Sequence, residues 1–286
     1  MKTIKIKETL SVEVLKRVVE TLRSGGVVLH PADTCYGLMA SVESVVGIEK
    51  VRALKGRGEQ KPFSLAVSSR IMLEKYAVPE EGIFKYLPGE VTFVLKARKH
   101  PLLLPLGKGE SKKKGWYINN EHCSSPLLDK EEGEGKDWCV NNRHNFPLLN
   151  KEGNKGRSIV VLDGTVGIRW TKSKLMSQII EALGCPVITT SANVSGQPSC
   201  YTVEEFEKQK QLQQASKQGL TLSDIGNWFS QGWPEGSEEM LVALDGGVIP
   251  PVPPSTVVKV IEGKWEVLRE GRKRVIKSQS DRVMES

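Results

Sequence analysis

The sequence predicts an α/β protein. Short segments rich in β-branched residues alternate with segments in which apolar residues recur at helical spacing, and this alternation is typical of a sheet covered by helices. Most strand-like segments end in Gly, Ser or Asn, which favour turns. The chain has 286 residues, of which 38% are hydrophobic and 26% charged, a composition that suits a globular domain with a substantial core.

The N-terminal part begins with a short alternating strand over residues 3–7. An amphipathic helix pattern over 11–26 follows; Ser11 is a favourable N-cap and two glycines end the pattern. Residues 27–38 run from a buried strand into a polar turn. A second helix pattern over 42–57 leads into three cations, Lys55, Arg57 and Lys61.

The remaining strands share β-branched composition and are expected at residues 63–69, 90–98, 165–170, 186–196, 241–247 and 255–268. Between the strands expected at 186–196 and 241–247, residues 206–238 start with a Gln- and Lys-rich stretch, which predicts an exposed helix followed by a loop.

Residues 106–158 break the alternation. "GWYINNEHCSSPLLDKEEG" returns as "DWCVNNRHNFPLLNKEG" within a polar region, and this tandem duplication predicts an inserted, disordered segment. The duplicated segment contains His122, Cys123, Cys139 and His144, so a zinc site with these four ligands is an alternative interpretation. Their spacing matches no usual finger pattern, and Asn145 replaces the cysteine in the second copy, so a surface insert without metal is the preferred interpretation.

Charge and cysteine content narrow the functional classes. The net charge of +7 permits a polyanionic partner such as a nucleotide or tRNA without requiring one. Five scattered cysteines do not form a disulfide framework. The first 22 residues lack the long apolar run of a secretory signal, and no stretch is long enough to span a bilayer, so a cytoplasmic location is expected.

Five polar stretches lie at the ends of predicted strands, where ligands bind in open α/β sheets. If they converge, they bring together cations, hydroxyls and one amide: Lys55, Arg57, Lys61, Arg169 and Arg269; Thr34, Thr165, Ser191 and Ser255; and Asn193. Such a site has no evident His or Cys nucleophile and no carboxylate pair. It suits phosphate binding and nucleotidyl transfer, in which positioning and charge neutralisation dominate. The sequence contains neither a P-loop nor a GxGxxG fingerprint.

These stretches resemble, in order, the motifs of the YrdC/TsaC family, the threonylcarbamoyl-AMP synthases. The matching segments are "PADTCYGL", "KGRGEQKP", "PGEVTFVL", "TVGIR", "SANVSGQPS" and "DGG…STVV…LREG". The resemblance implies a single domain over 8–271 with a twisted mixed open sheet, flanking helices and a concave basic cleft. Residues 106–158 would be an insert and 272–286 a tail. Because little chain follows "LREG", the short form without the family's extra C-terminal domain is expected.

The resemblance also implies an activity: synthesis of L-threonylcarbamoyl-AMP and pyrophosphate from L-threonine, bicarbonate and ATP, for threonylcarbamoyladenosine formation in tRNA. By matching motif positions, L-threonine would bind at Thr34, Arg169, Ser191 and Ser255. ATP would bind at Arg57, Lys61, Thr165, Asn193 and Arg269. Lys55 and Arg57 would be catalytic. Mg²⁺ would arrive with ATP, without a dedicated metal site, and a downstream transferase complex would receive the product.

Several alternatives stay open at this point. Many relatives have a histidine at Ala66 and a threonine at Tyr201, and these departures allow a YciO-like paralogue with little synthase activity. A basic surface could instead make an RNA-binding module that contacts tRNA or double-stranded RNA through phosphates. Taken alone, Lys55, Arg57 and Lys61 could form a solvated loop, and Ser191 and Asn193 could be a helix cap or turn pair.

Overall fold

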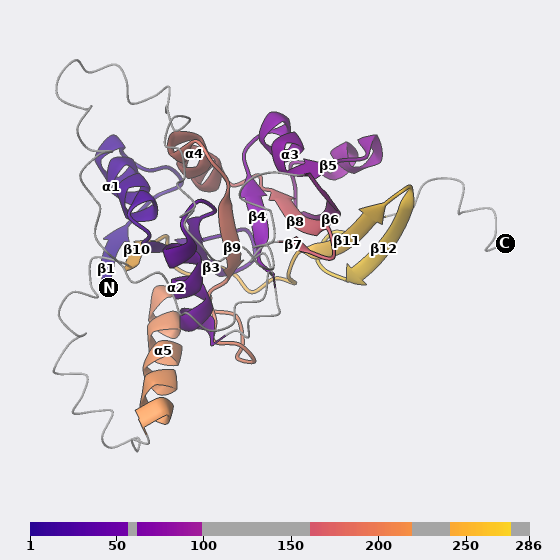
Figure 1. Cartoon of the computed structure of the whole chain (residues 1–286). Helices are drawn as coiled ribbons and strands as arrows, with labels where there is room; N and C mark the ends of the chain where they lie inside the picture. Colours follow the sequence, from indigo (N-terminus) through magenta and orange to yellow (C-terminus); the bar gives the residue numbers. More distant parts are fainter. Residues whose placement is uncertain (57–61, 99–160, 219–240, 276–286) are drawn as a thin grey trace, which may run out of the picture.

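The computed structural model describes residues 1–56, 62–98, 161–218 and 241–275. Its centre is a 12-stranded sheet in the order β1-β10-β2-β3-β9-β4-β8-β6-β11-β12, with β5 paired to β6 and β7 to β8 (Figure 1). The strands are β1 (Lys2–Lys5), β2 (Val27–Pro31), β3 (Tyr36–Ser41), β4 (Ser64–Val67), β5 (Ala77–Val78), β6 (Val91–Ala97), β7 (Val161–Leu162), β8 (Thr165–Trp170), β9 (Val187–Ser191), β10 (Leu241–Asp245), β11 (Thr256–Ile261) and β12 (Lys264–Arg269).

The sheet is mixed, which confirms the predicted fold class. β4 runs parallel to β8, whereas β9 runs antiparallel to both β3 and β4. Each strand expected from the sequence is present. β1 pairs with β10 although it lies before residue 8, where the domain was expected to begin, so the sheet also includes the first residues of the chain.

The helices are α1 (Val12–Arg23), α2 (Val45–Lys55), α3 (Arg70–Tyr76), α4 (Lys174–Leu183), α5 (Val203–Gln218) and a 3-10 helix, η1 (Glu81–Tyr86). In Figure 1, α1, α4 and α3 follow one side of the sheet, α2 packs against β3, and α5 projects from the opposite side. Serine side chains cap α1, α2, α3 and α4, because each accepts a hydrogen bond from a first-turn N–H.

The apolar residues of the helices and strands form one core. Leu22 of α1, Ile179 of α4, Leu38 of β3, Leu65 of β4 and Ile168 of β8 have no exposed surface. Close packing of this kind resists displacement, so the polar side chains at the strand ends rest on a rigid support.

Some of the expected features lie outside the described residues: Arg57, Lys61, the repeats of 106–158, and the loop within 206–238. The expected helix at the start of that last range is α5, which buries Val203, Phe206 and Lys210 rather than lying wholly exposed. Where the structure describes the chain, no helix is long and apolar enough to cross a membrane.

Candidate active site

One face of the central strands carries small and polar residues. Side chains alternate between the two faces of a strand, so the register of β3, β9, β4 and β8 places Gly37, Ser64, Gly167, Arg169, Thr189 and Ser191 on the same face. Of these six, all except Gly37 are partly exposed, whereas other residues of this face, Met39, Ser41, Ala66 and Val187, are buried. The residues of the opposite face, such as Leu65, Ile168 and Ile188, are buried in the core. A partly exposed floor of small residues in the middle of a sheet leaves room for a ligand.

Glycine at 167 keeps this floor open. A Cβ atom added there would lie 2.8 Å from Oγ of Ser64. Thr165 lies on the same face, four residues before Arg169, and a strand rises about 3.3 Å per residue, so the two are separated by about 13 Å. The Thr165 hydroxyl donates to the carbonyl of Leu162 at 2.8 Å. Thr165 and Arg169 could therefore contact opposite parts of an extended ligand, but not the same group.

Arg169 forms an ion pair with Asp33. Its Nη2 donates to Oδ2 of Asp33 at 2.8 Å, and the side chains are 15% and 17% exposed. The hydroxyl of Thr171 donates to the same carboxylate oxygen at 3.3 Å. Thr34, the next residue in the turn, is buried. The polar turn after β2 and the end of β8 thus meet, as the sequence predicted for Thr34 and Arg169.

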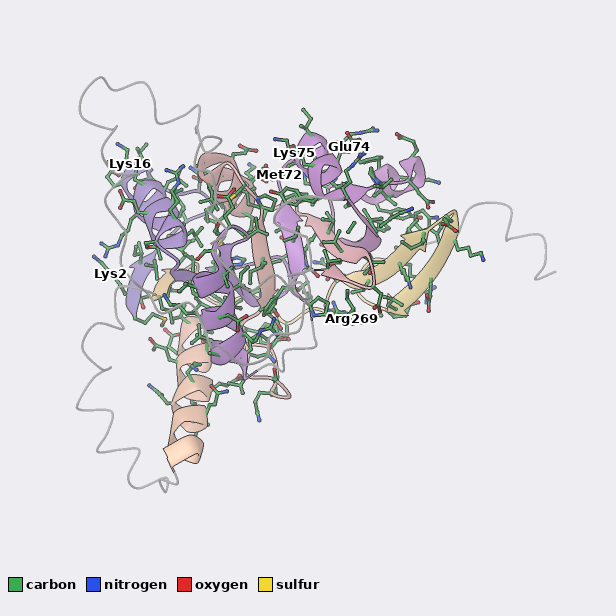
Figure 2. All side chains as sticks on the ribbon, viewed as in Figure 1. Lys2, Lys16, Met72, Glu74, Lys75 and Arg269 are labelled. Carbon is green, nitrogen blue, oxygen red and sulfur yellow. The ribbon has the colours of Figure 1, made fainter. Side chains whose placement is uncertain are left out.

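Arg269 bonds to Ser255 and is influenced by the charge of Arg169. The guanidinium of Arg269 donates twice to the carbonyl of Ser255, at 2.8 and 3.2 Å, and once to its hydroxyl at 3.3 Å. Burial, followed by repulsion from Arg169, lowers the pKa of Arg269. Within the described residues no carboxylate pairs with Arg269. Figure 2 shows it on the other side of the sheet from the α3 residues Met72, Glu74 and Lys75.

Lys55 is buried at the end of α2, with 4% of its surface exposed. Its ammonium donates to the carbonyls of Ser191 and Asn193, at 2.6 and 2.9 Å, and to Oδ1 of Asn193 at 2.9 Å. Oδ1 of Asn193 also accepts from the Ser191 hydroxyl at 2.6 Å. The Asn193 amide nitrogen donates to the carbonyls of Val194 and Gln197. Lys55, Ser191 and Asn193 therefore form one cluster, and their polar groups hold the loop after β9.

The predicted residues fall into two groups. Arg169, Arg269, Ser255 and Thr34 gather around the end of β8, and Lys55, Ser191 and Asn193 gather at the end of β9. Sequence reasoning missed Asp33, although it stands within "PADT", because no pattern in the sequence indicates that it pairs with Arg169.

His30 is fully buried beside this site. Its Nδ1 donates to the carbonyl of Pro31 at 3.1 Å, and among the described residues Nε2 has no hydrogen-bond partner. A Cβ atom added at Gly37 would lie 2.7 Å from Nε2, so the ring occupies the space above that glycine. Burial lowers the pKa of His30 to about 4, so the ring is neutral near pH 7.

A family model described as "Telomere recombination", for Sua5, YciO and YrdC proteins, matches residues 20–132 and 147–216, more than half of the chain. The chain belongs to the Sua5/YciO/YrdC family.

Two curated relatives of this family member are named for the same activity. A mouse threonylcarbamoyl-AMP synthase is 28% identical over 198 residues, 68% of this chain and 51% of the relative. A putative threonylcarbamoyl-AMP synthase of Methanocaldococcus jannaschii is 36% identical over 105 residues, 34% of this chain and 50% of the relative. The chain thus spans about half the length of these relatives.

Solved structures of the family share the fold. P. abyssi Sua5 complexed with L-threonine superposes with a TM-score of 0.61 at 19% identity, covering 95% of this chain and 58% of the Sua5 chain. E. coli YciO superposes with a TM-score of 0.58 at 18% identity, covering 95% of this chain and 96% of YciO.

Ala66 and Tyr201, the two residues that depart from the family pattern, lie in different environments. Ala66 is fully buried and in register with Arg169 of this Sua5/YciO/YrdC protein. The backbone of Tyr201 donates to the carboxylate of Glu205 at 2.6 Å, and its side chain is partly exposed. The described residues contain no cluster of His, Cys, Asp or Glu able to hold a metal ion, and the four repeat residues of the zinc alternative lie outside them.

Proposed function

We propose that this protein synthesises L-threonylcarbamoyl-AMP from L-threonine, bicarbonate and ATP and releases pyrophosphate. The observation that carries the proposal is the pair of neighbouring guanidiniums, Arg169 and Arg269, of which only Arg169 has a carboxylate partner among the described residues. The charge of Arg169 repels that of Arg269, so anionic groups that bind at the two guanidiniums relieve the repulsion. The names of the curated relatives support the choice of reaction.

Different residues of the site bind L-threonine and ATP. Arg169 binds the α-carboxylate of threonine through the guanidinium edge that Asp33 leaves free, and Thr34 and Ser255 supply neighbouring hydroxyls. Arg269, with Arg57 and Lys61, binds the ATP phosphates. Thr165, about 13 Å from Arg169 on the same face, contacts the far part of the nucleotide. Asn193 supports ATP through the loop after β9, since its own amide is already bonded within that loop.

In the proposed reaction, the threonine amine and bicarbonate condense to a carbamate with loss of water, and the ammonium proton is released. A carbamate oxygen then attacks the α-phosphorus as pyrophosphate leaves. Negative charge builds on the phosphate oxygens, and the cations Arg57, Lys61 and Arg269 offset it. Lys55 acts beside them by fixing the loop that carries Ser191 and Asn193. Mg²⁺ would accompany ATP without a dedicated protein site and would help to neutralise the charge of the phosphates. The product would pass to a threonylcarbamoyl transferase complex in the cytoplasm.

The test is pyrophosphate release from ATP and bicarbonate by the full chain, with and without L-threonine, with the product identified by mass. We expect threonine-dependent release and the mass of the threonylcarbamoyl adenylate. Arg169→Ala should lower that release at least tenfold, whereas Arg17→Ala, on the exposed side of α1, should leave it unchanged. Absence of release from folded protein that still binds ATP would contradict the proposal and favour a YciO-like paralogue. Salt-dependent RNA binding that survives Arg169→Ala would favour the RNA-binding module.

A further inference from the structure

The ion pair between Arg169 and Asp33 has the charge arrangement of an amino-acid binding site. We propose that Asp33 determines specificity by binding the α-ammonium of the substrate amino acid while Arg169 binds its α-carboxylate. This inference rests on the proposed function, because it concerns the threonine site of that reaction. It assigns a role to Asp33, which lies within the segment "PADTCYGL" but is not among the site residues expected from the sequence.

The two oxygens of the Asp33 carboxylate are used unequally. Oδ2 accepts from Arg169 at 2.8 Å and from Thr171 at 3.3 Å. Across the described part of the chain, no donor reaches Oδ1. An ionised carboxylate can accept about four hydrogen bonds, so this oxygen retains capacity for a charged donor. The side chain is 17% exposed, which leaves an approach to it.

The guanidinium of Arg169 likewise retains N–H donors for a ligand. A guanidinium has five N–H donors, and only Nη2 of Arg169 has a hydrogen-bond partner in the described residues. The remaining donors can bind a carboxylate in the bidentate manner that arginine favours. A free amino acid carries its ammonium and its carboxylate on one carbon. Adjacent negative and positive side chains therefore complement both groups at once, and the neutral zwitterion adds no net charge to the site.

The turn that presents Asp33 is fixed before any ligand binds. The N–H of Ala32 donates to the carbonyl of Cys35 at 3.1 Å and closes the turn. His30 Nδ1 donates to the carbonyl of Pro31 at its start. The next residue after the turn, Tyr36, donates its hydroxyl to the carbonyl of Gly247 at 2.8 Å. A carboxylate held in this way loses little freedom on binding an ammonium, which raises its contribution to affinity.

Asp33 could instead act only on Arg169, by orienting its guanidinium. The two roles differ in what they predict for a ligand without an amine. If Asp33 only orients Arg169, replacing Asp33 weakens every carboxylate ligand equally. If Asp33 binds the ammonium, the same replacement weakens only ligands that have one. (R)-3-Hydroxybutanoate provides this comparison, since it is L-threonine with the amine replaced by hydrogen.

The experiment measures binding of both compounds to the full chain by calorimetry, with Asp33→Asn as the test variant. The asparagine side chain has nearly the same shape as that of aspartate, but it carries no charge and has an NH2 donor in place of one acceptor oxygen. Asp163→Asn, in the exposed turn before β8, is the matched control. We expect Asp33→Asn to weaken L-threonine roughly 10- to 100-fold, as for loss of a partly buried charge-assisted hydrogen bond, and to leave (R)-3-hydroxybutanoate within about threefold. The control should change neither value.

Equal weakening of both ligands, or no weakening of L-threonine, would overturn the proposal. If Asp33→Asn does not fold, the unaltered protein still gives an answer: it should bind L-threonine at least about tenfold more tightly than (R)-3-hydroxybutanoate, and equal affinities would contradict the proposal. L-threonine binding without adenylate formation would overturn the proposed function alone. Absence of L-threonine binding to the unaltered protein would overturn both.

Discussion

Lys55 and Asn193 are joined by two hydrogen bonds of 2.9 Å, from one ammonium to a backbone carbonyl and a side-chain oxygen. A third bond reaches the carbonyl of Ser191 at 2.6 Å. The solvated-loop interpretation is therefore wrong for Lys55, whose ammonium is directed into the protein. A direct contact between Lys55 and the reacting groups stays a prediction, and the observed role is to hold the loop after β9.

Replacing Lys55 by methionine keeps the length of the side chain and removes the ammonium. Four partly buried acceptors on Ser191 and Asn193 would then lose a charged donor, so we expect a loss of about 3 kcal/mol in the free energy of unfolding, measured by urea denaturation. Lys16→Met, on the exposed surface of α1, should change it by less than about 0.5 kcal/mol. Equal stability of the two variants would show that the loop does not depend on Lys55.

Substitutions of Arg169 and Arg269 should raise the KM values of different substrates. A lysine at either position keeps the charge but cannot form the bidentate contacts of a guanidinium. We expect Arg169→Lys to raise the KM for L-threonine at least tenfold with little effect on the KM for ATP, and Arg269→Lys to do the reverse. Steady-state pyrophosphate release with each substrate varied in turn measures both. Parallel changes in the two variants would mean that the arginines share one ligand.

Position 271, occupied by glycine, has no room for a side chain, and a substitution there would disturb Ser255 and Arg269. A Cβ atom added at this glycine would overlap the carbonyl oxygen of Pro254 and lie 2.5 Å from the nitrogen of Thr256. Both obstacles are backbone atoms and cannot rotate away. We expect Gly271→Ala to lower the free energy of unfolding by about 2 kcal/mol or more and to impair ATP binding through Arg269.

Gly82→Ala is the control for that substitution. Its added Cβ would meet only the Trp265 ring, at 3.1 Å, and a ring edge can shift. Its unfolding free energy should stay closer to that of the unaltered protein. A Gly271→Ala protein as stable as Gly82→Ala would contradict the packing argument.

The free energy of unfolding should depend on pH because the pKa of His30 differs between the folded and unfolded protein. Its pKa is lowered to about 4 in the folded protein from an ordinary value of 6.5, because burial disfavours the charged ring. Above pH 6.5 the ring is neutral in both states. As the pH falls from 6.5 toward 4, the unfolded chain binds a proton that the folded protein does not, so stability decreases, by roughly 3 kcal/mol in all.

His30→Leu should remove this component and flatten the stability profile between pH 6.5 and 4. The charged groups that act on His30, Asp33 and Arg169, are present in both proteins, so the difference between the two profiles isolates the imidazole. Chemical denaturation at several pH values measures it. Parallel profiles would show that His30 does not titrate across this window.

The sequence predicted the secondary structure closely because the signals are local. The apolar spacing of α1 and its N-cap Ser11 both appear as expected, and α2 (Val45–Lys55) lies within the expected helix pattern of 42–57. Thr34, Arg169, Ser255 and Arg269 were also identified as polar residues at the strand ends of an α/β sheet, which form one site if those ends converge. Their roles toward L-threonine and ATP stay predictions. Arg57 and Lys61 stay predictions, since the structure does not describe them.

The partners of the site side chains could not be predicted in the same way. Asp33 and Arg169 are 136 residues apart, as are Lys55 and Ser191, and no periodic pattern relates such distant positions. The sequence by itself determined which residues form strands and helices and which are polar at their ends. Only the tertiary structure decided that Asp33 pairs with Arg169 and that Lys55 is directed into the loop after β9. Periodicity reports which face of an element is buried, whereas the pairing of side chains depends on strand register and on the packing of distant segments.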